Sequence, residues 1–480
     1  MTGWLILAAF VLLAVIGEPL FVSIGVVTVL CVGFVQNPAP SIQNSVDVLI
    51  EWFKMTDSPY PIAIPLFTLA GAIMTRGGIS SRLVAFARAV TCCLPGGLGM
   101  ACVVACTFFA ALSGSSAVTI IAIGGILYPA LIKDGFSDRF SLGLLTACGG
   151  IGILAPPSLP LIVFGIVSHA DINQLFIAGI LPGLLCIAAF LAWCGVKGVR
   201  LGVARSPWTT REVARTFWEG KWAVLLPVLL LGGIYSGLTT TIEASAVAVV
   251  YALVVEVWVH RELSWRELPK IALDTMVLVG SILIILLMAF SFTNFLTLEE
   301  VPQEAADWIR YDRVSYRDGG SIVGTITAEK PGEWIRISPK DPDEEAEEIP
   351  WAKVGSVRRH LVESRLGFLI AVNVLLLVVG CIMDIFSALV VFAPLIVPIA
   401  QQYGVDLVHL GIIFVVNLEI GFATPPFGIN LFISSSYFKR PVTEVFRASA
   451  PWLLILLSML AVITAFPDLS LWLVRLSGLR

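Results

Sequence analysis

The sequence GGIGILAPPS at residues 149–158 constrains the fold most, because LEIGFATPPF at residues 418–427 resembles it. The two stretches align without gaps at an offset of 269 residues. The identical pairs around them are Pro129 and Pro398, Gly135 and Gly404, Ile151 and Ile420, Gly152 and Gly421, Pro156 and Pro425, and Pro157 and Pro426. Most are Gly or Pro, which interrupt helices, so we expect an internal repeat with broken helices. The alternative is a chance match in a chain with 41 Gly and 27 Pro.

The composition places these breaks in a membrane. Hydrophobic residues make up 58% of the 480-residue chain, charged residues only 13%, and the mean hydropathy is +0.93. A soluble domain needs roughly 25% charged residues, so we expect a polytopic protein in a lipid bilayer. The net charge of −4 excludes a nucleic-acid-binding protein. The nine Cys lie in or beside apolar runs, and no metal-ligand set is apparent around the four His, so a metalloenzyme is not expected.

Several apolar stretches are long enough to cross, or nearly cross, the hydrocarbon. They lie at residues 4–34, 62–75, 175–196, 222–235, 244–259, 271–295 and 451–466. The first has no basic n-region and no cleavage site, so we interpret it as a retained helix rather than a signal peptide. Its interruption at Glu18 and Pro19 leaves open whether it crosses once or forms two short helices.

The charges orient the chain. Basic residues cluster next to the apolar stretches, at residues 76–88, 197–221, 261–270 and 439–447, and the positive-inside rule keeps such clusters in the cytoplasm. Residues 296–365 hold 15 acidic and 10 basic residues, which accounts for the whole negative balance. Because the stretch 271–295 leads outward from a basic cluster, we expect this acidic segment outside.

Each copy of the repeat contains two helix interruptions. In the first copy they are the tip, at residues 112–116, of a re-entrant hairpin over residues 94–132, and the unwound stretch at 149–158. In the second copy they are residues 380–384 and 420–426. Cytoplasmic basic residues precede the first copy and the outer acidic segment precedes the second, so the copies enter from opposite sides. Inverted repeats with discontinuous helices are typical of secondary transporters whose site lies near the membrane midplane.

The interruptions supply hydroxyls, free carbonyls and one carboxylate, which are oxygen ligands suited to sodium. The candidate sodium- and substrate-binding residues are Ser113, Gly114, Ser115, Ser116, Gly152, Ala155, Pro156, Ser158, Gly380, Asp384, Gly421, Thr424 and Pro425. For the four residues of the hairpin tip, the alternative is close helix packing by small side chains.

Carboxylates inside the membrane cost about 2.5–3.5 kcal/mol each and are functional candidates by default. Asp384 is the strongest, because the repeat aligns it with Ser115 at the hairpin tip. Glu419 is weaker, and a helix N-cap role is favoured for Glu243. Asp274 lies near an expected interface and receives no role.

An ordered set of short motifs runs along the chain. The motifs are Pro65-Leu66-Phe67, Arg76-Gly77-Gly78-Ile79, Leu94-Pro95-Gly96-Gly97, Ser113-Gly114-Ser115-Ser116, Ala155-Pro156-Pro157-Ser158 with Pro160, Met383-Asp384, Asn417-Leu418-Glu419-Ile420-Gly421 and Thr424-Pro425-Pro426-Phe427-Gly428. With them the chain resembles the large membrane subunit of tripartite ATP-independent periplasmic (TRAP) transporters, from about Trp4 to Phe466 apart from a charged insert.

The resemblance implies an all-α fold of the elevator type, with inverted repeats and two re-entrant hairpins, in the bacterial inner membrane. It also implies sodium as the coupling ion, no catalytic residues, a small TRAP membrane subunit as partner, and a periplasmic substrate-binding protein that delivers a carboxylate. Alternatives are a stand-alone ion-coupled carboxylate carrier of a related fold and a channel. A third is an intramembrane serine hydrolase using Ser115 and His409, although His409 is more readily interpreted as a satisfied helix-end histidine.

Two features depart from the resembled family. The residues Thr240-Thr241-Ile242-Glu243 replace its Thr-Pro-Thr-Glu, so we expect a less securely capped helix there. Residues 311–365 stand where the family has a short connection. Their apolar residues alternate as in strands, and Asp318-Gly319-Gly320 is typical of a hairpin turn. We therefore expect a small extramembrane β-rich module, in contact with the binding protein; the alternative is a disordered acidic loop.

The expected organisation follows. Scaffold helices occupy 1–60, the first transport repeat with hairpin 1 occupies 61–170, and further scaffold helices occupy 171–270. The second transport repeat with hairpin 2 occupies 271–310 and 366–440, the inserted extracytoplasmic module 311–365, and a C-terminal helix 441–480.

Overall fold

The computed structural model describes residues 20–34, 60–203, 207–340, 345–359, 362, 364–425 and 428–478. Among these residues, eight helices are long and apolar enough to cross a membrane, or up to ten if each of two bent helix pairs counts as one span. The prediction of a polytopic α-helical membrane protein is therefore confirmed. The expectations for residues 4–19, with the break at Glu18 and Pro19, and for Pro426 and Phe427 lie outside the described residues.

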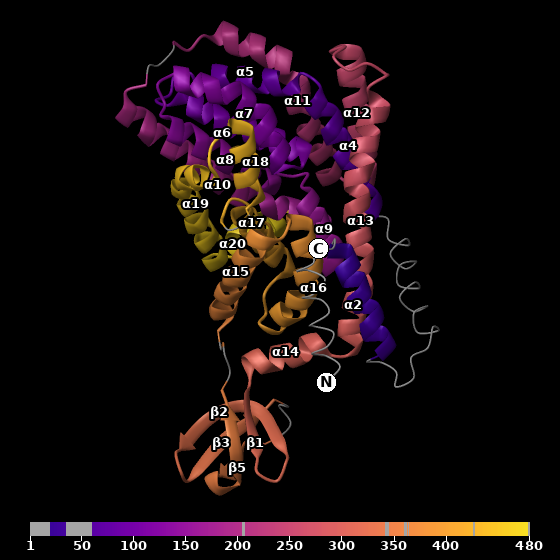
Figure 1. The fold of residues 1–480 in the computed structure, drawn as a ribbon, viewed down its shortest axis with the longest axis vertical. Coiled ribbons are helices and arrows are strands. Elements are labelled where there is room, and N and C mark those ends of the chain that lie inside the picture. The colour runs from indigo at the N-terminus through magenta and orange to yellow at the C-terminus, as the bar shows by residue number, and fades with distance from the viewer. Residues whose placement is uncertain are drawn as a thin grey trace.

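The first half of the chain forms a helical body that includes hairpin 1, built from α6 and α7 (Figure 1). Its elements are α2 (Leu20–Phe34), η1 (Tyr60–Ile62), α4 (Ala63–Arg76), α5 (Ile79–Thr91), α6 (Gly97–Ser113), α7 (Ser116–Lys133), α8 (Asp138–Ile151), η2 (Gly152–Leu154), α9 (Leu159–Ser168) and α10 (Ile172–Leu201). The chain bends by 74° between α4 and α5 and by 47° between the α8–η2 segment and α9. The second bend is the predicted unwound stretch.

The second half contains hairpin 2, built from α15 and α16, and the strands of the insert. Its helices are α11 (Thr210–Tyr235), α12 (Thr241–Leu253) with its π-helical extension η3 (Val254–Val259), α13 (Leu268–Leu298), α14 (Val301–Arg310), η4 (Trp351–Lys353), α15 (Arg365–Ile382), α16 (Ile385–Gln402), α17 (Leu407–Phe422), α18 (Ile429–Phe438), α19 (Val442–Ala465) and α20 (Asp468–Ser477). The single C-terminal helix expected at 441–480 is thus wrong. Pro467, which has no amide donor, separates α19 from α20.

The helix boundaries confirm the internal repeat. Helix α16 has the bounds of α7 shifted by 269 residues at both ends, and the same shift relates the starts of α8 and α17 and the ends of α6 and α15. Gly135 and Gly404, an aligned pair, both adopt positive φ after the second hairpin helix. Hairpin 1 lies in the upper half of the helical body and hairpin 2 in the lower half (Figure 1). The two hairpins therefore approach the centre from opposite ends, as predicted.

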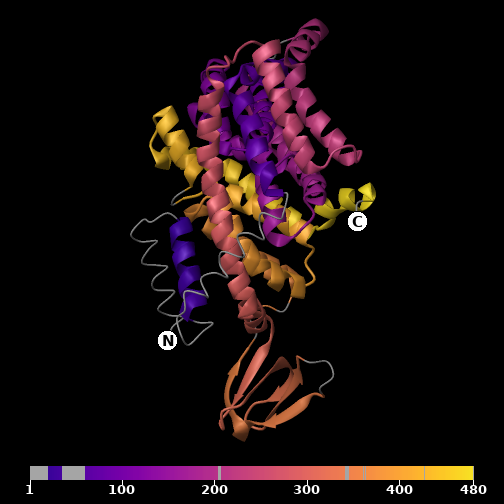
Figure 2. The same ribbon diagram turned by 90° about the vertical axis from the view of Figure 1, so that its right-hand side faces the viewer.

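The insert is an antiparallel sheet of five strands in the order β4-β3-β2-β1-β5. The strands are β1 (Asp312–Tyr316), β2 (Ser321–Lys330), β3 (Trp334–Pro339), β4 (Glu347–Pro350) and β5 (Val354–Arg358). Val314, Ile335 and Ile337 are fully buried in its small core. The sheet projects beyond α14, away from the helical body (Figure 2). The prediction of a β module is confirmed against that of a disordered loop for all of it except residues 341–344, which are outside the described part.

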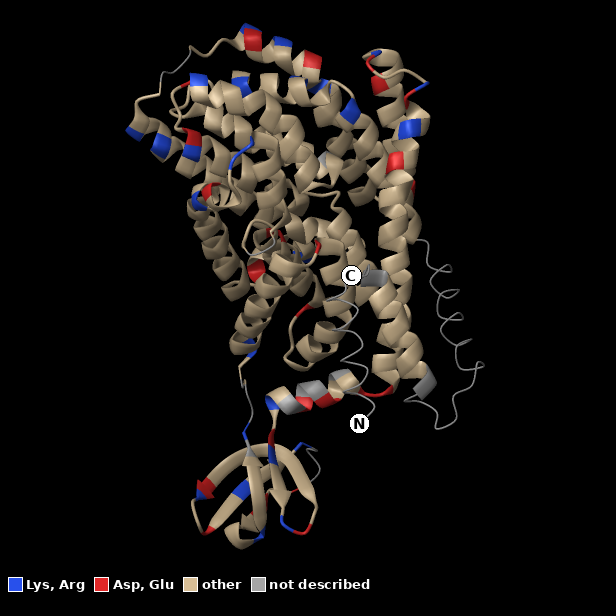
Figure 3. Ribbon diagram, viewed as in Figure 1, with Lys and Arg blue, Asp and Glu red and all other residues tan. Residues whose placement is uncertain are grey.

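Lys and Arg side chains gather at the end of the helical body opposite the β module, around α5 and the start of α11 (Figure 3). This distribution is the one that the positive-inside rule predicts for a cytoplasmic end.

The start of α12 corrects one expectation. Thr240 Oγ1 accepts a hydrogen bond from the Glu243 amide at 3.2 Å, and the Glu243 carboxylate accepts one from the Thr240 amide at 2.8 Å. This reciprocal pair is a complete capping box. The departure from Thr-Pro-Thr-Glu therefore leaves the helix start securely capped, and Glu243 has the N-cap role that was favoured for it.

Candidate functional site

The tip of hairpin 1 is a tight turn between α6 and α7. Gly114 adopts a left-handed conformation with φ +63°, and a Cβ there would lie 2.6 Å from a methyl carbon of Leu159. Ser115 is the N-cap of α7, since its Oγ accepts a hydrogen bond from the Val118 amide at 3.4 Å. Ser113 contributes a hydroxyl that lies 3.3 Å from Ser115 O. The predicted tip is therefore confirmed, and its small residues are needed for the turn itself.

The tip of hairpin 2 has the same design with a carboxylate in place of a hydroxyl. Asp384 is the N-cap of α16, and its Oδ1 accepts hydrogen bonds from Phe386 N at 3.1 Å and Ser387 N at 3.0 Å. Both bonds go to one oxygen, so Oδ2 remains free of the cap. Ser115 and Asp384 thus hold equivalent N-cap positions, 269 residues apart. A structural role for Asp384 is established by this geometry, and an ion-binding role stays a prediction.

The two unwound stretches are held mainly by capping and close packing. Ser158 caps α9 by accepting from Leu161 N at 3.4 Å, and Thr424 Oγ1 donates to Ile420 O at 2.7 Å. A Cβ on Gly152 would lie 2.2 Å from Thr107 O, and a Cβ on Gly421 would lie 2.6 Å from the backbone of Gly380. The three glycines therefore let backbones from neighbouring helices touch.

A buried chain of polar side chains connects hairpin 1 to the second repeat. Ser116 Oγ donates to Asn430 Oδ1 at 2.9 Å, and Asn430 Nδ2 donates to Glu419 Oε1 at 3.1 Å. The other oxygen of Glu419, Oε2, is buried and has no hydrogen-bond partner among the described residues. The carboxylate packs against Gly150, where an added Cβ would overlap it. Glu419 is therefore more central than the sequence indicated, and Asn430 was missed although it is a polar residue in an apolar run.

A cavity of about 320 Å³ lies where the hairpin tips meet the scaffold. Hairpin 1 contributes Ser113, Gly114, Ser115, Ser116, Ala117 and Val118; hairpin 2 contributes Ile385 and Phe386; the unwound segments contribute Ile153, Leu159, Phe422 and Ile429; α4 contributes Thr68, Ala72, Thr75 and Arg76; and α13 contributes Ile271, Asp274, Thr275 and Leu278. Four predicted residues, Ser113 to Ser116, line it. The other predicted residues, Gly152, Ala155, Pro156, Ser158, Gly380, Asp384, Gly421, Thr424 and Pro425, do not, although their chain neighbours do.

The scaffold wall of this cavity carries charges to which the sequence assigned no role in binding. Arg76 and Asp274 form an ion pair at 3.2 Å between Nη2 and Oδ2, with about half of each side chain exposed. They supply the only charged side chains among the described residues that line the cavity. Arg76 stands in one of the quoted motifs, but its position in a basic cluster suggested only sidedness. Since Arg76 and Asp274 belong to helices 198 residues apart, only the packing of α4 against α13 brings them together.

A second cavity, of about 630 Å³, lies further along the same walls. It is lined by Tyr60, residues 165–167 and 169–172 at the α9–α10 connection, Ala289, Phe290, Thr293, Asn294 and Thr297 of α13, and Val390 of α16. Helices α9, α13 and α16 border both cavities. Along α13, Thr275 and Ala289 are about 20 Å apart at 1.5 Å per residue. The two cavities therefore occupy different depths of one pathway along α13.

Two repeated, broken-helix units that enclose a cavity at their hairpin tips define a membrane permease of the secondary-transporter class. Residues 6–469 match the family described as "Tripartite ATP-independent periplasmic transporter, DctM component". The chain belongs to this family, so the resemblance recognised in its motifs is confirmed.

Relatives and a solved structure agree with this assignment. The chain is 36% identical over 423 residues to the C4-dicarboxylate TRAP transporter large permease protein DctM of Pseudomonas aeruginosa, covering 88% of each chain. It is 32% identical over 503 residues to the Rhodobacter capsulatus protein of the same description, covering all of both. It is 33% identical to the ectoine/5-hydroxyectoine TRAP transporter large permease protein UehC of Ruegeria pomeroyi, over 86% of this chain and 85% of that one. The Alcanivorax borkumensis YdaH transporter shares the fold, with a TM-score of 0.57, 12% identity, and coverage of 90% of this chain and 89% of that one.

Proposed function

We propose that this chain is the large permease subunit of a sodium-coupled, binding-protein-dependent transporter that imports an organic acid across the bacterial inner membrane. The observation that carries the proposal is the cavity of about 320 Å³ in which both hairpin tips face Arg76 of the scaffold. Small-molecule sites are of this size, mostly apolar, with a few polar groups that fix orientation.

The substrate is a small carboxylate. Arg76 offers a guanidinium that can bind a carboxylate through two parallel hydrogen bonds, and the hydroxyls of Thr68 and Thr75 lie in the same wall. Binding requires Arg76 to exchange its partner Asp274 for the substrate. The half-exposed state of this pair makes the exchange inexpensive, because exposed ion pairs contribute only about 0–1 kcal/mol.

Sodium binds at the helix interruptions, one region in each repeat. The proposed ligands are the hydroxyls of the first tip, the Oδ2 of Asp384, and backbone carbonyls freed at the two unwound stretches. The residues concerned are Ser113, Gly114, Ser115, Ser116, Gly152, Ala155, Pro156 and Ser158 in the first repeat and Gly380, Asp384, Gly421, Thr424 and Pro425 in the second. Broken helices with freed carbonyls are tolerated in a membrane where protein covers them, and these segments are largely buried.

Transport follows an elevator mechanism in which the hairpin-bearing block moves against the scaffold. The hairpin helices with α8, α9, α17 and α18 form the block, while α4 and α13 form the scaffold wall. The cavities along α13 support two positions for the cargo, since one opens beside Arg76 and Asp274 and the other near the α9–α10 connection.

Coupling energy limits the stoichiometry. One ion crossing 100 mV gains about 2.3 kcal/mol, and a tenfold gradient adds about 1.4 kcal/mol. Two sodium ions with a dianion move no net charge, which leaves about 2.8 kcal/mol, or about a hundredfold accumulation. A dicarboxylate substrate therefore benefits from a third ion.

The partners are a small TRAP membrane subunit and a periplasmic binding protein that delivers the substrate. Uptake into proteoliposomes containing both membrane subunits tests the proposal. We expect uptake only with an inward sodium gradient and the binding protein present. Uptake without the binding protein would favour a stand-alone carrier, and uptake indifferent to sodium would overturn the coupling.

The β module contacts the binding protein. Its two ends are adjacent, because Arg313 of β1 pairs with Arg358 of β5, so residues 311–357 can be replaced by a short Gly-Ser linker. We expect this deletion to impair binding-protein-dependent uptake while the two membrane subunits still copurify. Uptake equal to that of the full chain would contradict the role.

A further inference from the structure

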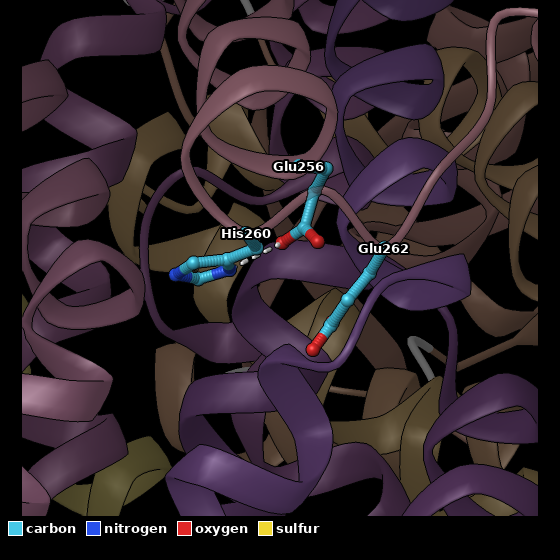
Figure 4. A group of neighbouring side chains, drawn as sticks. All are labelled: Glu256, His260 and Glu262. Carbon is cyan, nitrogen blue, oxygen red and sulfur yellow. Dashed lines mark ion pairs between the residues drawn. The ribbon is translucent and has the colours of Figure 1, made fainter.

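Three ionisable side chains meet at the elbow between α4 and α5, away from both cavities. Glu256 lies in the π-helical segment η3, His260 follows this segment, and Glu262 lies in the loop after it (Figure 4). A carboxylate oxygen of each Glu and a ring nitrogen of His260 all lie within 4.8 Å of one another. The Nδ1 of His260 and Oε1 of Glu256 are 3.6 Å apart. Two ligands of a tetrahedral zinc ion are separated by a similar distance, about 3.3–3.6 Å, given metal–ligand bonds of about 2.0–2.2 Å.

Glu256 gives an independent indication that a cation is bound here. Its side chain is fully buried, and neither carboxylate oxygen has a hydrogen-bond partner among the described residues. A buried carboxylate without a partner is strongly unfavourable, so buried charges are normally paired or coordinate a metal. The dashed line in Figure 4 shows that the side chain points toward His260.

The backbone of the elbow is shaped around the two carboxylates. A Cβ at Gly77 would lie 1.9 Å from Oε2 of Glu256, and a Cβ at Gly78 would lie 2.0 Å from Oε2 of Glu262. The two glycines after Arg76 therefore allow the α4–α5 turn to close over the cluster. A metal held there would join this turn to the end of α12.

Arg82 of α5 accounts for part of the charge but not for Glu256. Its guanidinium donates to both carboxylate oxygens of Glu262, at 2.6 and 3.1 Å, and its Nη1 lies 3.1 Å from His260 Nδ1. Arg82 lowers the pKa of the Glu262 carboxyl, and burial together with Arg82 lowers the pKa of His260. Arg82 thus neutralises Glu262, and the second negative charge, on Glu256, is left uncompensated.

We propose that Glu256, His260 and Glu262 form a binding site for a divalent first-row transition metal, such as Zn²⁺, that fastens the α4–α5 elbow to the end of α12. Two carboxylates and one imidazole suit Zn²⁺ or Mn²⁺, and a water molecule completes a tetrahedral set. Arg82 releases His260 Nδ1 when the metal binds and can keep one oxygen of Glu262. The spacing of Glu256 and His260, four residues apart on one helical face, was a signal in the sequence.

Metal titration of the full-length chain tests the site. The chain is purified in detergent, freed of any affinity tag and of metal with a chelator, and titrated with Zn²⁺ and Co²⁺. We expect about one metal per chain by elemental analysis, and the visible absorption bands of tetrahedral Co²⁺. Loss of an outer partner of a metal ligand lowers affinity about 10–100-fold, so the Glu256→Gln and His260→Gln variants should each lose at least about tenfold.

Two further variants separate a metal site from an ion-pair network. Glu219→Gln removes an exposed carboxylate near the basic end of the molecule and should leave metal binding unchanged. Arg82→Gln should strengthen metal binding, because it removes a positive charge that competes for His260 and Glu262. Absence of stoichiometric metal in both the unmodified chain and Arg82→Gln would overturn the proposal, as would unchanged affinity in Glu256→Gln and His260→Gln. Size-exclusion profiles like that of the unmodified chain show that each variant is folded.

Discussion

The two repeats share one backbone plan and differ in chemistry. Ser115 and Asp384 cap equivalent helices, yet one is a neutral hydroxyl and the other a carboxylate. Gly150 and Glu419 are also equivalent under the 269-residue shift, and the glycine of one repeat packs against the carboxylate of the other. Residues related by the repeat therefore touch each other near the centre. Only one carboxylate fits there, so the glycine in the first copy is a requirement of the second.

The comparison teaches that duplication preserves interruptions and caps, while function is assigned to one copy at a time. Helix ends at the same shifted positions show that the broken frame is shared. The acidic groups near the breaks, Asp384 and Glu419, belong to the second copy. Exchanging or removing the unlike residues tests which differences matter.

The largest effect is expected at the hairpin tips. Asparagine also caps helices well, so Asp384→Asn keeps the start of α16 and removes only the charge. We expect sodium-dependent uptake to be abolished in this variant, and only reduced in Ser115→Ala, which removes the equivalent cap of α7. Initial uptake rates as a function of sodium concentration measure both. Normal sodium dependence in Asp384→Asn would refute the assigned role.

The contact between equivalent residues gives the next largest effect. A methyl group in Gly150→Ala overlaps the Glu419 carboxylate, and overpacking of this kind costs about 3 kcal/mol. We expect a lower thermal unfolding midpoint in detergent. The double variant with Glu419→Ala should recover most of the loss. Equal destabilisation by Gly150→Ala with and without Glu419 would show that the two residues do not share the space.

The buried polar chain between the repeats should respond to a smaller extent. Asn430→Leu leaves Glu419 without its donor, and an unsatisfied buried partner costs about 2 kcal/mol. Ser116→Ala removes only the outer link of the chain and should cost about 1 kcal/mol. Thermal unfolding of the two variants side by side measures the order, and the reverse order would argue against Glu419 as the group that the chain serves.

The smallest effect is expected at the caps that start α8 and α17. Ser137 accepts one amide bond, from Phe140, whereas Asp406 accepts two, from Val408 and His409. Replacement by Ala should cost about 1 kcal/mol at each position. We expect Asp406→Ala to be the more destabilising, because its charge also interacts with the helix dipole. A larger loss in Ser137→Ala would show that the first copy depends more on this cap.

Much of the fold was predictable because it depends on local signals. Pro and Gly mark the interruptions wherever they occur in an apolar run, and small polar residues mark the caps that follow. The strands of the insert were predictable from alternation around the Asp318-Gly319-Gly320 turn, which lies between β1 and β2. The interpretation of His409 was half right. It is buried near the start of α17 with Nδ1 3.2 Å from Ser470 Oγ, but Nε2 has no partner among the described residues.

The candidate site was only partly predictable. The four residues of the first tip were correctly placed at the cavity, because a turn of small residues between apolar helices has few other uses. Arg76 and Asp274 were missed as cavity residues, since each lies near a helix end where charges are common. Asn430 was missed because its partners, Ser116 and Glu419, follow no fixed spacing.

The sequence by itself determined the membrane setting, the inverted repeat, the broken helices and the separate β module. These follow from hydropathy, charge bias and residues that cannot continue a helix, all of which act within a few residues along the chain. The tertiary structure alone decided which polar groups meet. The cavity charges, the Glu419 chain and the Glu256 cluster join helices from distant parts of the sequence. Each buried polar group needs a partner in a medium of low dielectric constant, but only helix packing selects which partner it finds.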